Sequence, residues 1–548
     1  MLRGLFGGAA ALALVLSAGL ASAQDFSADR ISQDIRHISS DDFQGRYPGT
    51  EGERLTLAWL QAQYEEFGLE PGGPNGQWLQ DVVLKRFTPV AGAASASWTG
   101  PDGTVHPMAV GTDILLRSAT NDGKADIEDA PVVFVGYGIH APERDWDDWG
   151  DIDVRGKVVV VIGGEPNSAE VAERFNGAYP TAYSNGWYKQ DEAFRRGAVG
   201  VVTLSMVPAT DAGWLRGAQF GARQRTLTPG AADLEFTGAI NHDVGLAWAG
   251  AAGVDAATLA DVESGAFKAV ALTGVTLSVA HEEAIDTLTT HNLLAKIPGT
   301  THPDETIIYS AHWDHVGVGA DHVSAVSTTE DNIYNGAWDN ASGTAGIVEM
   351  ARQIKAAPRP ERTIVFAHMA AEEMGLLGSY GYAANPVYPL ETTVADINID
   401  MLPLSGPTRD VAIFGKGQNT LEDDLAVLAA AEGRVITDDR QPEQGFYTRS
   451  DHFPFVRMGV PALMTWHGVD WDEGGVEAGQ AAWTAKFGAD YHRPSDEWSA
   501  DWDLRSAVEN LTLLYRLGLQ LANSDAWPTW KPTSEFGARR AASDGARQ

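Results

Sequence analysis

The feature that most constrains the fold is a regular alternation of short apolar runs and helical segments, which begins near Val275. Residues 292–297, 306–310, 363–367 and 394–399 are predicted strands, and the spacing of apolar residues predicts a helix over 344–355. Strands that alternate with helices form a largely parallel sheet covered by helices on both faces. We therefore predict an α/β domain of three layers, with a mostly parallel central sheet, over residues 268–530.

The region before this domain has a different pattern of apolar and turn residues. Residues 131–135, 158–162 and 199–204 are short runs rich in β-branched residues, separated by glycine-containing turns, and are predicted strands. This region has no cluster of histidine and acidic residues. We therefore expect residues 120–267 to form a smaller, β-rich domain without chemistry of its own, and the polar tail 531–548 to be disordered.

The first 23 residues have the features of a signal peptide. Arg3 precedes an apolar stretch over 5–20, and Ala21-Ser22-Ala23 places small residues directly before Gln24. The alternative is a membrane anchor, but the stretch is short for a spanning helix, and no other run approaches that length. We expect a periplasmic or secreted protein that is not an integral membrane protein and whose mature chain begins near Gln24.

Composition narrows the classes of partner and site. The chain has 39 basic and 74 acidic side chains, a net charge of −35, which disfavours nucleic acids and anionic membranes as partners. Because the chain has no cysteine, a metal site would have to use histidine and carboxylate ligands. The sequence assigns no oligomeric state.

Five candidate ligands each lie at the end of an expected strand or in a neighbouring loop. Alone, each has an ordinary explanation, such as a helix cap, an Asx turn or a solvated acidic pair. Together they mix nitrogen and oxygen donors as zinc prefers, and they suffice for two metals that share one carboxylate. The five residues are His312, Asp339, Glu373, Asp400 and His492.

The order and spacing of six segments resemble a known family, the co-catalytic di-zinc exopeptidases of clan MH. That family includes bacterial leucyl-type aminopeptidases and glutamate carboxypeptidases. The segments are 310–315 (SAHWDH), 335–343 (NGAWDNASG), 371–379 (AEEMGLLGS), 398–401 (NIDM), 450–452 (SDH) and 491–492 (YH). The resemblance implies two Zn²⁺ per chain, with Asp339 bridging the ions. His312 and Asp400 would complete one site, and Glu373 and His492 the other.

The resemblance also implies catalytic roles. Glu372 would be the general base that takes a proton from water and passes it to the leaving amine. Asp314 would support His312, and Tyr447 would steady the oxyanion. Residues 39–50 are similar to the segment that opens the catalytic domain in many members, which assigns 24–119 to that domain, and 120–267 resembles the protease-associated domain often inserted there.

We expect an aminopeptidase that removes N-terminal residues from peptides. A carboxypeptidase of the same family is the nearest alternative. A glutaminyl cyclase would use one zinc, and a non-catalytic binding protein would lack ligands or the base. The complete set of five ligands argues against both.

Overall fold

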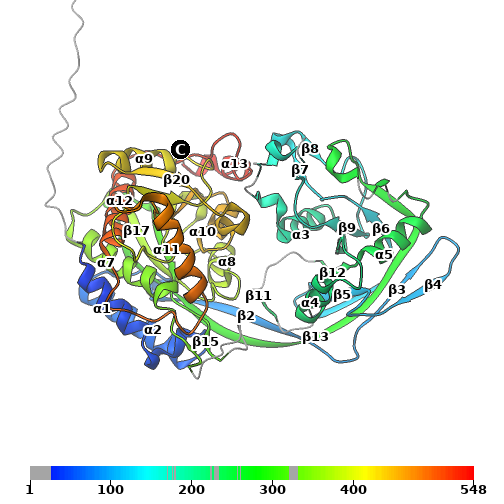
Figure 1. Cartoon of the computed structure of the whole chain (residues 1–548), viewed down its shortest axis with the longest axis horizontal. Coiled ribbons are helices and arrows are strands. Elements are labelled where there is room, and N and C mark those ends of the chain that lie inside the picture. Colours follow the sequence, from blue (N-terminus) through cyan, green and yellow to red (C-terminus); the bar gives the residue numbers. More distant parts are fainter. Residues whose placement is uncertain are drawn as a thin grey trace, which may run out of the picture.

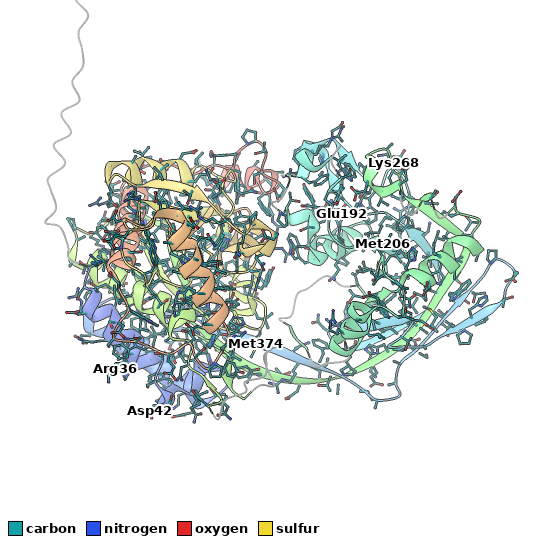
Figure 2. The ribbon with its side chains drawn as sticks, in the orientation of Figure 1. Arg36, Asp42, Glu192, Met206, Lys268 and Met374 are labelled. Carbon is teal, nitrogen blue, oxygen red and sulfur yellow. The ribbon has the colours of Figure 1, made fainter. Side chains whose placement is uncertain are left out.

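The computed structural model describes residues 26–168, 171–175, 177, 180–221, 225–227, 234–255, 257–258, 261–319 and 331–547. The predicted leader, residues 1–23, lies outside them. Two lobes lie side by side, joined along one side by the strands β2 (Leu79–Pro89) and β13 (Val270–Ile297) (Figure 1). Figure 2 shows their side chains, with Met374 in the first lobe, at the left, and Met206 in the second lobe, at the right.

A mixed sheet forms the centre of the first lobe. Strands β17, β14, β18 and β21 are parallel to one another, and β13 and β19 pair antiparallel at their two sides. β2 pairs with β13, and β20 pairs with β19. In spatial order the strands are β2, β13, β17 (Arg362–Met369), β14 (His302–His312), β18 (Thr393–Asn398), β21 (Ala462–Trp466), β19 (Asp410–Ile413) and β20 (Val435–Asp438).

Alternate residues of the central strands face two separate helical layers. In β14, Tyr309 packs in the large core with helices α1, α2, α7 and α12, whereas Ile308 packs in the smaller core with α8 and α10. The predicted three-layer α/β fold is confirmed. The helices of this lobe are α1 (Ala28–Ile38), α2 (Glu51–Phe67), α7 (Gly343–Ala356), α8 (Leu377–Ala384), α9 (Leu421–Ala431), α10 (His452–Arg457), α11 (Gly475–Asp490), α12 (Arg505–Ala522) and α13 (Gly537–Ala541).

The second lobe has its own sheet and its own core, which includes residues from Ala96 to Val279. It therefore begins earlier and ends later than the expected boundaries, 120 and 267. The sheet order is β4 (Val105–Met108), β3 (Ser95–Thr99), β13, β6 (Lys124–Phe134), β9 (Val158–Ile162), β10 (Gly200–Leu204), β12 (Phe236–Ile240) and β5 (Ile114–Ser118), with helices α3 (Gly186–Arg195), α4 (Ala212–Gly221) and α5 (His242–Ala251).

The C-terminal segment differs from the disordered tail that we expected. It contains α13, and the Arg540 side chain is buried, donating to the carbonyl oxygens of Leu390 and Thr393 at 3.0 and 2.8 Å. The carboxylate of Glu535 accepts the Ala182 N–H at 3.0 Å, so the segment contacts both lobes. We predicted disorder from the polar composition of this segment. The sequence does not show that buried main-chain carbonyl oxygens would accept hydrogen bonds from Arg540. None of the described helices is long and apolar enough to cross a membrane.

Candidate metal centre

The parallel strands bring most of the predicted residues to one edge of the sheet. His312 ends β14, Glu372 and Glu373 follow the end of β17, and Asp400 follows β18. The carboxyl ends of parallel strands share an edge, which is where ligands bind in such sheets. Asp339 lies in η8 (Ala337–Ser342), directly before α7, and its own backbone is not helical (φ −106°, ψ 103°).

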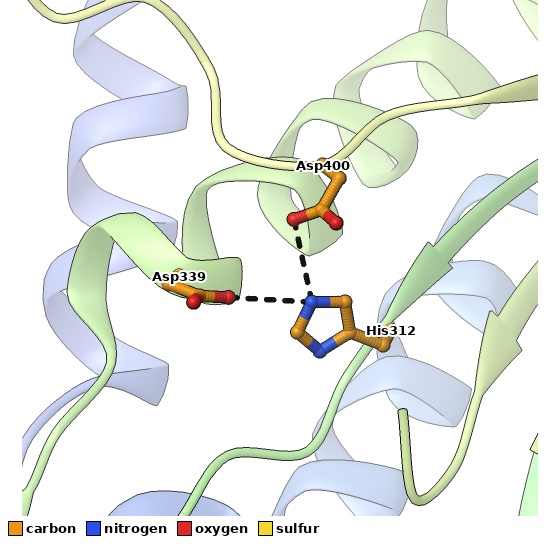
Figure 3. Close-up of side chains that lie close together, drawn as sticks. All are labelled: His312, Asp339 and Asp400. Atoms are coloured by element: carbon orange, nitrogen blue, oxygen red, sulfur yellow. Dashed lines mark hydrogen bonds and ion pairs between the residues drawn. The ribbon is translucent and has the colours of Figure 1, made fainter. Parts of the chain in front are cut away.

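The first group of ligands is centred on His312. Its Nε2 lies 3.3 Å from Oδ1 of Asp339 and 3.4 Å from Oδ1 of Asp400 (Figure 3). Nδ1 lies 3.1 Å from the main-chain carbonyl oxygen of Asp314, which can only accept, so Nδ1 donates this hydrogen bond and Nε2 is the ring nitrogen that faces the carboxylates. The hydroxyl of Ser450 donates to Oδ2 of Asp400 at 2.7 Å and orients that carboxylate.

Asp314 supports the site differently from what a His-x-Asp pair suggests. Its carboxylate lies 3.8 Å from Nδ1 of His312, and its Oδ1 accepts the main-chain N–H of Glu372 at 3.1 Å. The carbonyl of Asp314 thus orients His312, and its side chain holds the loop that carries Glu372. Burial raises the pKa of the Asp314 carboxyl to about 8.

The second group uses the other oxygen of Asp339. Nε2 of His492 lies 3.2 Å from Oδ2 of Asp339 and 3.0 Å from Oε2 of Glu373. Nδ1 of His315 approaches the remaining oxygen of Glu373, Oε1, at 2.6 Å. His315, Asp339 and Glu373 also have donor atoms close enough to hold one ion together. Sequence analysis did not single out His315, although it follows His312 by three residues in the same loop.

These distances fit two zinc ions. Ligand atoms about 2.0–2.1 Å from a tetrahedral zinc lie roughly 3.3 Å from each other. The four separations between ligand atoms around His312 and His492 run from 3.0 to 3.4 Å. Asp339 gives one oxygen to each group, as a shared ligand must. Burying several carboxylates together is costly without cations, and bound metal would remove that cost.

The pKa values of Asp339 and Glu372 are shifted in opposite directions. Burial opposes ionisation of Asp339, but hydrogen bonds from His312 and His492 outweigh it and hold the pKa of this carboxyl well below its usual range. At Glu372, by contrast, burial raises the pKa well above its usual range; the charge of His312 opposes the shift, and the neighbouring Glu373 and Asp400 add to it. The surroundings of Glu372 thus favour the protonated form of its carboxyl, whereas those of Asp339 favour the ionised form.

A small cavity opens over the centre. Its lining includes Asp339, Glu372 and Asp400 together with Arg449 and Tyr491. The apolar residues Met401, Phe446, Met464 and Trp466 complete much of its wall.

The tyrosine at this cavity is Tyr491 and not the predicted Tyr447. Tyr491 stacks on His492 with ring centroids 3.8 Å apart. Burial raises its pKa well above the usual range, and the charges of Asp339 and Glu373 contribute. Tyr447 instead packs against Phe453, and its hydroxyl has no hydrogen-bond partner among the described residues. Adjacency to His492 is the signal in the sequence that would have made Tyr491 a candidate beside Tyr447.

Comparison with known proteins finds a similarity in the region that carries this centre. Residues 292–515 match the profile of peptidase family M28. Aminopeptidase NAALADL1 from Mus musculus is 33% identical over 141 residues, 25% of this chain and 17% of that protein. Leupeptin-inactivating enzyme 1 from Streptomyces exfoliatus is 28% identical over 212 residues, 38% of this chain and 43% of that protein. The chain thus spans less than half the length of these curated relatives.

Among solved structures, an aminopeptidase from Aneurinibacillus sp. strain AM-1 is similar over 91% of this chain and 95% of that one, with a TM-score of 0.45 and 18% identity. The profile match covers both ligand groups, Glu372 and Tyr491. The matched residues 292–515 are thus similar to peptidase family M28, and they include the whole candidate metal centre.

Proposed function

We propose that this chain is an aminopeptidase that binds two zinc ions and removes N-terminal residues from peptides. The observation that carries the proposal is the geometry of Asp339, whose two oxygens face two separate ligand groups with Glu372 beside them. Bound zinc would polarise the scissile carbonyl and lower the pKa of a water molecule. His312 and Asp400 would hold one ion, Glu373 and His492 the other, and Asp339 both.

Glu372 is the proposed general base. Its Oε2 lies 4.0 Å from Nε2 of His312, so it borders the first group while its side chain lines the cavity. In this role it takes a proton from the attacking water and delivers it to the leaving amine. The Tyr491 hydroxyl would donate a hydrogen bond to the carbonyl oxygen as negative charge develops there.

The choice of an aminopeptidase is supported by the similarity to aminopeptidase NAALADL1. One observation favours a second candidate, a carboxypeptidase of the same family: Arg449 also lines the cavity, where Nη2 donates to the Tyr491 hydroxyl at 3.4 Å. A guanidinium at this position could pair with a substrate carboxylate.

Hydrolysis of amino-acid p-nitroanilides, compared with their N-acetylated forms, tests the proposal when zinc is assayed in the same preparation. The aminopeptidase predicts cleavage of free-amine substrates alone and about two zincs per chain. Cleavage of N-acetylated dipeptides at a free C-terminus would instead support the carboxypeptidase. Glu372→Gln should bind zinc normally and lose turnover; normal turnover in this variant would refute its role as base.

We also propose that residues 1–23 direct export to the periplasm or beyond, supported by Arg3, the apolar run and the Ala-Ser-Ala site. N-terminal sequencing of the exported protein should give a start near Gln24. The second lobe is proposed to be a protease-associated domain that shapes substrate access, supported by the glycine-containing motifs of residues 136–200.

A further inference from the structure

A fully buried arginine lies behind the metal centre. Arg46 ends η1 (Asp41–Arg46), far from the ligands in the sequence, and its side chain has no exposed surface. Nε donates to the carbonyl oxygen of Trp313 at 2.9 Å, Nη1 to that of Asn335 at 2.7 Å, and Nη2 to that of Gly336 at 2.8 Å. One guanidinium thus ties the main chain that follows His312 to the main chain that precedes Asp339.

Burying a guanidinium costs free energy because the charge loses its hydration. A neutral donor could form hydrogen bonds to the same carbonyl groups without that cost. Burial lowers the pKa of Arg46 to about 10, and the carboxylates of Asp496, Asp314, Asp339 and Glu373 oppose that shift. The charge therefore lies within the field of the metal centre. Arginine also provides a rigid fork of five donors, which lets a single side chain reach two loops at once.

A buried carboxylate holds the same loop from the other side. Oδ1 of Asp496 accepts the N–H of Trp338 at 2.9 Å, and Oδ2 accepts the N–H of Asp339 at 3.0 Å. Arg46 therefore fixes two carbonyls before Asp339, and Asp496 fixes two amides at it. Both oxygens of Asp339 face ligand groups, so a small shift of this loop would disturb two sites together.

We propose that Arg46 is a positioning residue of the metal centre, which with Asp496 sets the placement of Asp339 relative to His312. The inference rests on the two-zinc centre of the proposed function and goes beyond it, because the hydrogen bonds that Arg46 donates go to main-chain carbonyl groups. It acts on the main chain that carries them.

Arg46→Lys tests the proposal, because lysine keeps the charge but its single ammonium cannot span both loops. We expect the zinc affinity, measured by competition with a chelator, to fall by about 10–100-fold. The visible spectrum of the protein loaded with Co²⁺ should also change, since it reports ligand geometry directly. A purely structural arginine would lower the melting temperature and leave both readouts unchanged.

Arg362→Lys is the matched control. Arg362 is also buried, with 1% of its side chain exposed, and donates to the carbonyl oxygens of Leu521 and Ala526 at 3.0 and 2.7 Å. It begins β17, at the end of the strand opposite the metal centre. This variant should be less stable but should keep native zinc affinity and the native cobalt spectrum.

Native zinc affinity and cobalt spectrum in folded Arg46→Lys would overturn the inference, as would an equal loss in Arg362→Lys. If Arg46→Lys does not fold, Asp496→Asn decides: it preserves shape, but its amide group would face one of the two N–H donors. It should lower zinc affinity and alter the cobalt spectrum, and native values would overturn the inference. A native protein without bound zinc would overturn the proposed function as well.

Discussion

Asp339→Asn is the substitution that most directly tests the shared carboxylate. The two oxygens of Asp339 lie 3.3 Å from Nε2 of His312 and 3.2 Å from Nε2 of His492. Asparagine keeps the shape of the side chain, but one oxygen becomes an NH₂ group that cannot bind a cation, and the negative charge is lost. One zinc site therefore loses a ligand, and the other keeps a weaker, neutral one.

The size of the effect follows from the number of ligands. Zinc sites with four protein ligands bind with about 10–16 kcal/mol, or roughly 3 kcal/mol per ligand. Loss of one ligand should therefore raise the zinc dissociation constant of that site on the order of 10²-fold. The second site should weaken by a smaller factor, because the amide oxygen still faces it. Neither site should keep native affinity.

Equilibrium dialysis against buffers of fixed free zinc, followed by metal analysis, measures both sites. Asp400→Asn is the matched control, because Oδ1 of Asp400 lies 3.4 Å from Nε2 of His312 and belongs to the first group alone. It should leave one site with native affinity, whereas Asp339→Asn leaves none. Two zincs bound with native affinity in Asp339→Asn would refute the shared ligand.

Three further predictions concern the cavity, a buried histidine and the C-terminal segment. Tyr491→Phe should lower kcat by about 10²-fold with zinc retained, whereas Tyr447→Phe should keep near-native kcat; the reverse result would restore Tyr447 as the oxyanion donor. Burial lowers the pKa of His368 to about 3, below its ordinary 6.5, so the unfolded chain binds the extra proton and stability is lost as pH falls from about 6.5 towards 3. The free energy of unfolding of zinc-loaded protein, measured with urea at several pH values, should fall less steeply with pH in His368→Gln, by up to ~1.4 kcal/mol per pH unit. The same pH dependence in both proteins would contradict this prediction. Truncation after Trp530 should lower the melting temperature and expose the second lobe to proteolysis, because Glu535 contacts that lobe; an unchanged melting temperature would indicate a free tail.

The fold of the first lobe could be predicted because each of its main strands and helices buries a full face of apolar residues. Such a face leaves a regular pattern in the sequence. The predicted helix over 344–355 is α7, Gly343–Ala356, and the predicted strand over 394–399 is β18, Thr393–Asn398. The course of β13 was not predictable in the same way. Residues 292–297 read as one short strand, but β13 runs continuously from Val270 to Ile297, pairing with β6 in one lobe and β17 in the other. A local pattern cannot show that two different sheets share one strand.

The residues of the site also differ in whether the sequence could predict them. The ligands were predictable because side chains with metal-binding chemistry followed strands that share an edge. The structure assembles all five, and their roles remain proposals. Tyr447 and Tyr491 could not be ranked from the sequence, since both are tyrosines close to motif residues and only the packing shows which one lines the cavity.

Sequence motifs could not identify Arg46 and Asp496, and the reason is physical. Their partners are main-chain carbonyl and N–H groups, which every residue possesses and no sequence pattern displays. They are nevertheless the two buried charges that hold the Asp339 loop from opposite sides. A ligand that serves one ion can adjust by rotating its side chain, but a carboxylate held between two groups has no such freedom. The position of Asp339 must then be set by its main chain, and hydrogen bonds from charged groups are among the strongest interactions that can hold that main chain in place.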